Sequence, residues 1–120
     1  MITDGEDNSS SITLDRTKEV AEQERVAVFS LQARNEKVMN PEEIRHGARA
    51  LKEISESTGG LAFFPKKLED GVQPLLKTIH EQWVLDLEPA LALDQKQHAL
   101  IVKSSQKGIE LSVPAHVSTR

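Results

Sequence analysis

The chain has 120 residues, of which 38% are hydrophobic and 28% charged, and its net charge is −4. This length and composition fit one globular domain with a modest core and exclude a disordered chain. Both signs of charge are spread along the sequence, which argues against a nucleic-acid surface, and no stretch approaches the roughly 18–20 apolar residues of a membrane span. The absence of cysteine excludes disulfides, thiol catalysis and thiolate metal sites.

The first quarter of the sequence predicts a strand, a helix and a second strand. Residues 1–3 have the character of a strand end, and a polar loop follows over 4–11. We expect further sequence upstream, because a fold seldom starts with three strand residues and an acidic loop. Thr13 is a good N-cap for a helix over 14–25. Residues 26–31 are a short apolar run rich in β-branched side chains, which predicts a buried strand.

The strongest local signals belong to a second helix that begins after Asn40. Asn40 is the N-cap, Pro41 occupies the first helical position, and two glutamates lie in the first turn. The helix ends at Thr58-Gly59-Gly60, where a glycine fits the left-handed cap position. Residues 61–64 then predict a short buried strand that Pro65 ends. One helical stripe carries the residues expected to face the core, namely Ile44, Ala48, Leu51 and Ser55 with Ala50 and Ile54 beside them.

The remaining sequence predicts a third helix and a β region. The helix is expected over residues 67–82. Gly71 and Pro74 weaken its first half, and the alternative is a helix that starts only at Pro74. Residues 83–87 change to strand character, and Trp83 is expected to anchor the core, which is otherwise aliphatic because aromatic residues are scarce. Residues 99–103 and 109–113 predict a β-hairpin across 104–108.

This order of elements predicts an α/β fold. Alternating strands and helices form a parallel sheet with helices on both faces, as in Rossmann-like domains, and the last part forms a separate antiparallel β extension. We place the α/β part at residues 1–82 and the β extension at 83–120.

Three carboxylates, Asp4, Glu6 and Asp7, follow the first predicted strand. Ligands bind at the carboxyl ends of strands in open α/β sheets, and hard cations such as Mg²⁺ prefer oxygen ligands. Other groups have simpler interpretations. Thr58-Gly59-Gly60 follows a helix and is a helix stop instead of a phosphate loop. The histidines at 46, 80, 98 and 116 share no ligand spacing, and the serines at 9–11 lack a nearby base.

Several segments, in order, resemble von Willebrand factor A-type (VWFA) domains, in particular the VWFA-related group common in Acidobacteria. The first is the strand end and acidic loop, Ile-Thr-Asp-Gly-Glu-Asp-Asn-Ser-Ser. The others are the Ala50-Leu51 helix running into Thr58-Gly59-Gly60, the Ala62-Phe63-Phe64-Pro65 strand, the Leu68 to Gln82-Trp83-Val84-Leu85 junction, and the tail segments at 98–102 and 108–111. The resemblance covers nearly the whole chain and identifies it as the C-terminal portion of such a domain.

The resemblance implies a protein-interaction, adhesion-type module without enzymatic activity. The family binds a divalent cation, usually Mg²⁺, at a metal-ion-dependent adhesion site (MIDAS). Of that ligand set only Asp4 is matched here, so the site is incomplete and we expect magnesium binding by this chain to be weak or absent. The string Asp-x-Ser-x-Ser occurs at 7–11, but after the Asp-Gly element, in the wrong loop for the family's first motif. Related bacterial proteins are often exported, and the compartment is left open.

Two further expectations follow. An alternative function is a small magnesium-dependent phosphoryl-transfer or receiver-like signalling domain built on Asp4, Glu6 and Asp7. Against it, no lysine partner of the required kind follows the strands at 26–31 and 61–64.

The resemblance also bears on stability. In the family fold the strand that carries the first metal motif lies beside the strand that ends at Thr3. Without it the sheet edge is open, so we expect marginal stability or self-association through that edge.

Overall fold

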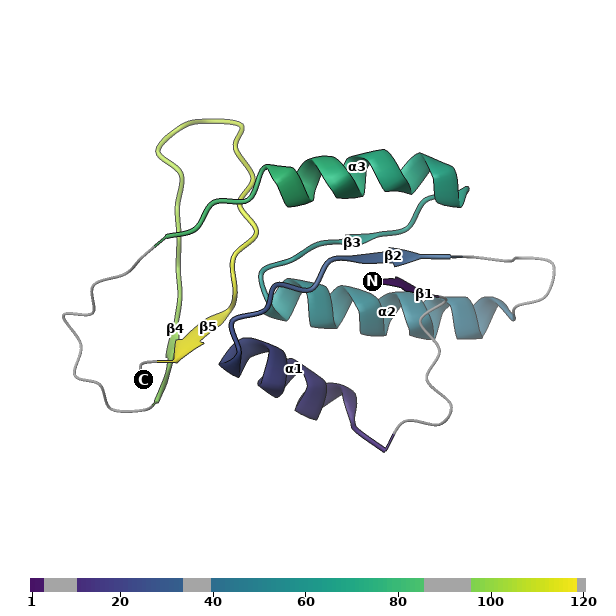
Figure 1. Ribbon diagram of the computed structural model, residues 1–120, viewed down its shortest axis with the longest axis horizontal. Coiled ribbons are helices and arrows are strands. Elements are labelled where there is room, and N and C mark those ends of the chain that lie inside the picture. The colour runs from purple at the N-terminus through teal and green to yellow at the C-terminus, as the bar shows by residue number, and fades with distance from the viewer. Residues whose placement is uncertain (4–10, 34–39, 86–95, 119–120) are drawn as a thin grey trace.

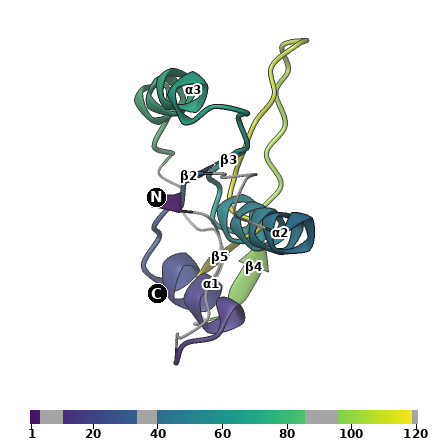
Figure 2. The same ribbon diagram turned by 90° about the vertical axis from the view of Figure 1, so that its right-hand side faces the viewer.

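The computed structural model describes residues 1–3, 11–33, 40–85 and 96–118. It contains a parallel sheet with helices on both faces and a separate antiparallel pair of strands, which confirms the α/β fold (Figure 1). Helices α1 and α2 lie on one face of the sheet and α3 on the other (Figure 2). The described elements are, in order, β1 (Ile2–Thr3), α1 (Leu14–Gln23), β2 (Ser30–Gln32), α2 (Pro41–Ser57), β3 (Ala62–Phe63), α3 (Leu68–His80), β4 (Gln97–Ala99) and β5 (His116–Ser118).

Strand β2 is the centre of the sheet and of the core. It pairs in parallel with β1 and with β3, so that Leu31 lies opposite both Ile2 and Phe63. All three residues of β2 are fully buried, because α2 packs on one face and α3 on the other. The apolar core is correspondingly small and aliphatic, consisting of Leu31, Leu51, Ile54 and Leu75.

Buried hydroxyl groups join α2 to β2. The Ser30 and Ser55 hydroxyls are hydrogen-bonded at 2.8 Å, and neither residue is exposed to solvent. The Thr58 hydroxyl donates to the Ile54 carbonyl at 2.8 Å and accepts from the Val28 backbone N–H at 3.0 Å. Because a buried polar group without a partner is costly, these bonds fix the position of the helix against the strand.

Helix α2 follows its sequence signals closely. Asn40 forms a capping box in which its side chain accepts from the first turn and Glu43 accepts from the Asn40 backbone N–H at 3.0 Å. Leu51 and Ser55, on the predicted stripe, and Ile54, beside it, are buried. Gly59, at φ +81°, takes the left-handed conformation that stops the helix.

Helix α3 is longer than its proline suggested, because it begins at Leu68 and contains Pro74 in its interior. A proline removes one helical hydrogen bond, and packing against β2 offsets that loss. Gly71 is the contact point. A side chain at this position would collide with Leu31 and Pro65, so the absence of one lets α3 lie close to the sheet.

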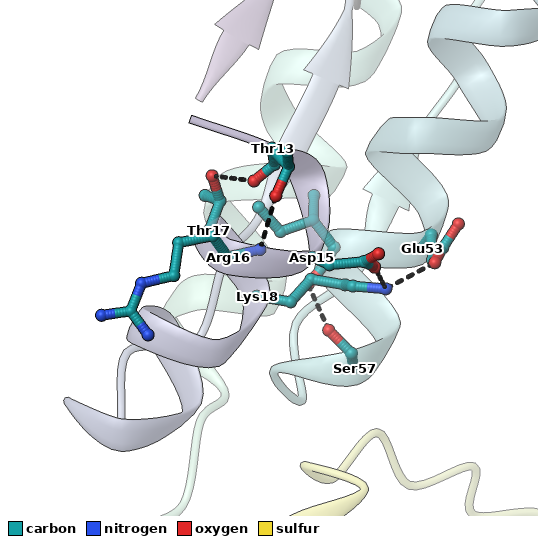
Figure 3. A network of polar contacts seen from close by, with 8 residues as sticks. Thr13, Asp15, Arg16, Thr17, Lys18, Glu53 and Ser57 are labelled. Carbon is teal, nitrogen blue, oxygen red and sulfur yellow. Dashed lines mark hydrogen bonds and ion pairs between the residues drawn. The ribbon is translucent and has the colours of Figure 1, made fainter. Parts of the chain in front are cut away.

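Helix α1 is attached to α2 by an ion-pair network. Thr13 caps α1 by accepting from the Arg16 N–H at 3.2 Å, as predicted. The Lys18 ammonium contacts Asp15 at 2.9 Å on its own helix and Glu53 on α2 at 2.5 Å (Figure 3). These carboxylates raise the pKa of Lys18, chiefly through the hydrogen bond to Glu53. No residue of α1 is buried, so polar contacts are a substantial part of its attachment.

Three expectations about the strands were wrong in position. β2 begins four residues later than predicted, because residues 26–29 connect it to α1 and the Val28 N–H bonds to Thr58 instead of to a strand. The hairpin strands lie at 97–99 and 116–118, whereas the predicted segments 99–103 and 109–113 are outside the ladder except for Ala99. Trp83 is 89% exposed and anchors no core. Of the strand predicted at 83–87, residues 83–85 form no strand, and residues 86–87 lie outside the described residues.

Candidate functional site

The predicted metal residue, Asp4, lies outside the described residues, as do Glu6 and Asp7. Asp4 directly follows Thr3 in the sequence, and Thr3 ends β1 at the carboxyl edge of the sheet. At the same edge, the Gln32 amide donates to the Ile44 carbonyl at 3.0 Å, and the Glu43 carboxylate closes the capping box. The side chains of Gln32 and Glu43 are therefore already engaged in structural hydrogen bonds.

The described part of the chain holds no group of three or more histidine, aspartate or glutamate residues placed to bind a metal. The four histidines are spread over α2, the end of α3 and the two strands of the hairpin. In the hairpin, His98 lies opposite Val117 and His116 opposite Ala99, so the two rings do not face each other across the ladder. A cofactor assignment for this chain therefore depends on Asp4 and remains a prediction.

The clearest binding feature among the described residues is the open edge of β1. Met1 and Thr3 face β2, because the Leu31 N–H donates to the Met1 carbonyl at 2.9 Å and the Ala33 N–H donates to the Thr3 carbonyl at 2.8 Å. Backbone groups alternate in direction along a strand, so the N–H and C=O of Ile2 point away from β2. No described residue pairs with this side, and the Ile2 side chain is 58% exposed.

The opposite side of the sheet differs, since the C-terminal region contacts residues 57–60, which lead into β3. The Ser112 hydroxyl donates to the Gly60 carbonyl at 2.8 Å, and the Ala115 N–H donates to the Ser57 carbonyl at 3.2 Å. Thr58 and Pro114 form an isolated antiparallel bridge. The two edges are thus unequal, and within the described ranges only the β1 edge is entirely uncovered.

Exposed aliphatic side chains gather in a second place, the loop of the C-terminal hairpin. Ile101 is 78% exposed, and Ile109 and Leu111 are about half exposed. The same loop carries Lys103 and Lys107, with Glu110 as its acidic residue. The sequence predicted strands here, whereas residues 101–113 pair with no strand among the residues that the structure describes.

Sequence reasoning missed the buried serine pair that joins α2 to β2. The signal was present, because Ser55 lies on the apolar stripe of its helix and Ser30 lies in an apolar run. Two hydroxyls at positions that face a core predict a mutual hydrogen bond.

Among the described residues, no helix is both long enough and apolar enough to cross a membrane.

The chain matches no protein-family model, no curated protein and no solved structure. The similarity to VWFA domains therefore rests on the sequence segments alone.

Proposed function

We propose that this chain is a non-enzymatic protein-interaction module of the VWFA type, which binds an extended segment of a protein partner at the open edge of β1. The observation that carries the proposal is the outward direction of the Ile2 backbone groups beside exposed Met1 and Ile2 side chains. An unpaired, apolar strand edge offers hydrogen bonds and a surface to another strand.

The arrangement of the sheet supports this choice of edge. Strand addition needs a firmly held template, and β1 is held by hydrogen bonds to a β2 strand that is wholly buried. A strand added beside β1 extends the sheet between the two layers of helices and leaves the bonds to β2 intact. At the other side of the sheet, the C-terminal region already contacts Gly60, two residues before β3.

The metal site has a minor role in this proposal. Asp4 is the one residue matched to the family's ligand set, and a single carboxylate competes poorly with the water shell of Mg²⁺. We expect calorimetry with magnesium to give no heat of binding in the micromolar range, for the wild-type chain and for Asp4→Ala alike. Micromolar binding that is lost in Asp4→Ala would instead favour the magnesium-dependent alternative.

The proposal is tested by selecting extended peptides from a random library that bind the wild-type chain. The matched control is Ile2→Pro, which removes the outward N–H while the bonds of Met1 and Thr3 to β2 remain. We expect selected peptides to alternate apolar and polar residues and to bind Ile2→Pro at least about tenfold more weakly. Peptides that bind both proteins equally, away from β1 in chemical-shift mapping, would contradict the proposal.

A further inference from the structure

The end of α2 is the place where the C-terminal region is fixed to the α/β part of the molecule. The C-terminal strap, defined here as residues 112–118, leads from the hairpin loop into β5. The Ser112 hydroxyl donates to the Gly60 carbonyl at 2.8 Å, within the segment that follows α2. The Ala115 N–H donates to the Ser57 carbonyl at 3.2 Å, at the last residue of α2. The strap is therefore held to α2 at two points.

Two glycines allow backbone segments to approach closely at this place. A Cβ on Gly59 would lie 2.6 Å from Pro114, and a Cβ on Gly60 would collide with the Val28 carbonyl. Between the strap and the residues that lead into β2 lies Thr58, which is 3% exposed and accepts a hydrogen bond from the Val28 N–H. Thr58 also forms the isolated bridge with Pro114. The strap thus covers a buried polar contact of the α/β part.

Helix α1 lies beside α2 and beside β5, the last part of the strap (Figures 1 and 2). None of its residues is buried, whereas α2 and α3 both bury side chains against β2. Leu14, Lys18 and Ala21 follow one face of α1 and are only half-buried. Because apolar burial is the main stabilising term in packing, α1 is held less firmly than the other two helices.

The C-terminal end of α1 also has a costly backbone conformation. Arg25 has a φ of +56°, in the left-handed region, where a Cβ crowds the following carbonyl oxygen. The Val26 N–H donates to the Ala21 carbonyl at 2.8 Å, and the Arg25 N–H donates to the Glu22 carbonyl at 3.1 Å. This conformation closes the last turn of the helix, and its cost is released when the end of α1 opens.

We infer that α1 and the C-terminal strap form one unit that opens and closes against a frame of β2, α2 and α3, without unfolding of that frame. The strap supports α1 through β5 and is itself held at the end of α2. On the other side of α1, Lys18 contacts Glu53 of α2. Opening uncovers Thr58 and the side of α2 that carries Glu53. This conformational device does not depend on the proposed binding at the β1 edge.

Amide hydrogen exchange of the full chain, measured residue by residue by NMR, tests whether the two parts open together. The Ala115 N–H reports on the strap, and the Glu24 N–H reports on α1. We expect Ser112→Ala to speed exchange at both amides at least about threefold, because it removes a hydrogen bond of the strap. Ser104→Ala is the matched control, since that hydroxyl bonds within the hairpin loop, and it should leave both rates unchanged.

Two variants act from the α1 side in opposite directions. Lys18→Met removes the contact with Glu53 and should speed exchange at Ala115 as well as at Glu24, by about twofold to fivefold. Arg25→Gly removes the Cβ from the left-handed position and should slow exchange at both amides at least about threefold. A variant that fails to fold cannot slow exchange, so Arg25→Gly keeps the test independent of damage to the fold.

Ser30→Ala tests whether the unit opens separately from the frame. It removes a buried hydrogen bond between β2 and α2, so it should speed exchange at Leu31 and leave the Ala115 and Glu24 rates unchanged. A Glu24 rate that does not change in Ser112→Ala would overturn the inference. So would Ala115 and Glu24 rates that rise together with the Leu31 rate in Ser30→Ala.

Discussion

The interior around β2 and the arm of the C-terminal hairpin, residues 100–113, use their residues in opposite ways. Around β2 even polar side chains are fully buried, and Ser30 and Ser55 satisfy each other across the helix–strand contact. In the arm and the segment before it, Ile101 and Trp83 are 78% and 89% exposed. The difference shows that burial here follows the presence of a covering element and not the hydrophobicity of the residue.

The largest expected effect is the difference in free energy of unfolding when one aliphatic side chain is deleted from each region. Leu31→Ala removes a fully buried side chain between α2 and α3 and should lower the free energy of unfolding by about 2–5 kcal/mol. Ile101→Ala, measured by urea denaturation at a concentration where the chain is monomeric, should change it by less than about 0.5 kcal/mol. Equal losses at the two sites would show that the arm is packed in solution and would break the comparison.

A smaller effect is expected at the buried serine pair. Ser30→Ala leaves the Ser55 hydroxyl without its partner and should cost about 1–3 kcal/mol of unfolding free energy. Ser30→Ala with Ser55→Ala removes both hydroxyls and should cost less than the sum of the single changes. The double-mutant cycle, measured by chemical denaturation, checks this, and strict additivity would show that the two hydroxyls do not interact.

The smallest effect is expected at the ion pairs that attach α1. Lys18→Met should lower the free energy of unfolding by no more than about 1 kcal/mol. Glu53 and Asp15 raise the pKa of Lys18 above its ordinary value of 10.5, so the contribution is complete below that pH and is lost as the pH rises through the folded-state pKa. Lys52→Met, which removes an ion pair within α2, is the control: it leaves the contacts of Lys18 with Asp15 and Glu53 in place, so the pH dependence of the wild-type stability should persist.

Local signals in the sequence predicted α2 almost completely. Its cap at Asn40, its proline at the first position and its glycine stop each act within a few residues, so no knowledge of the rest of the fold is needed. Helix α3 was less predictable, because the penalty of Pro74 is local whereas the contact of Gly71 with Leu31 that compensates it is distant in sequence. The parallel β1–β2–β3 sheet followed from the order of elements.

The features that the sequence placed wrongly depend on contacts between distant parts of the chain. Residues 99–103 and 109–113 have strand propensity, and Trp83 has the size of a core anchor, but neither property reveals whether a partner surface exists in the same chain. The candidate binding edge could be anticipated only from the resemblance, which implies a neighbouring strand beside β1. The outward direction of the Ile2 backbone groups follows only from the pairing of Ile2 with Leu31, which the sequence does not show.

Amide hydrogen exchange at Ile2 tests the central claim, that the outer edge of β1 is a binding surface, most directly. In dilute solution the Ile2 amide should exchange much faster than the Leu31 amide, which is bonded to the Met1 carbonyl. Addition of an edge-binding peptide, or concentration of the chain itself, should slow exchange at Ile2 at least about tenfold and leave Leu31 nearly unchanged. An Ile2 amide that is already protected in the dilute monomer, or that stays unprotected in the complex, would contradict the account.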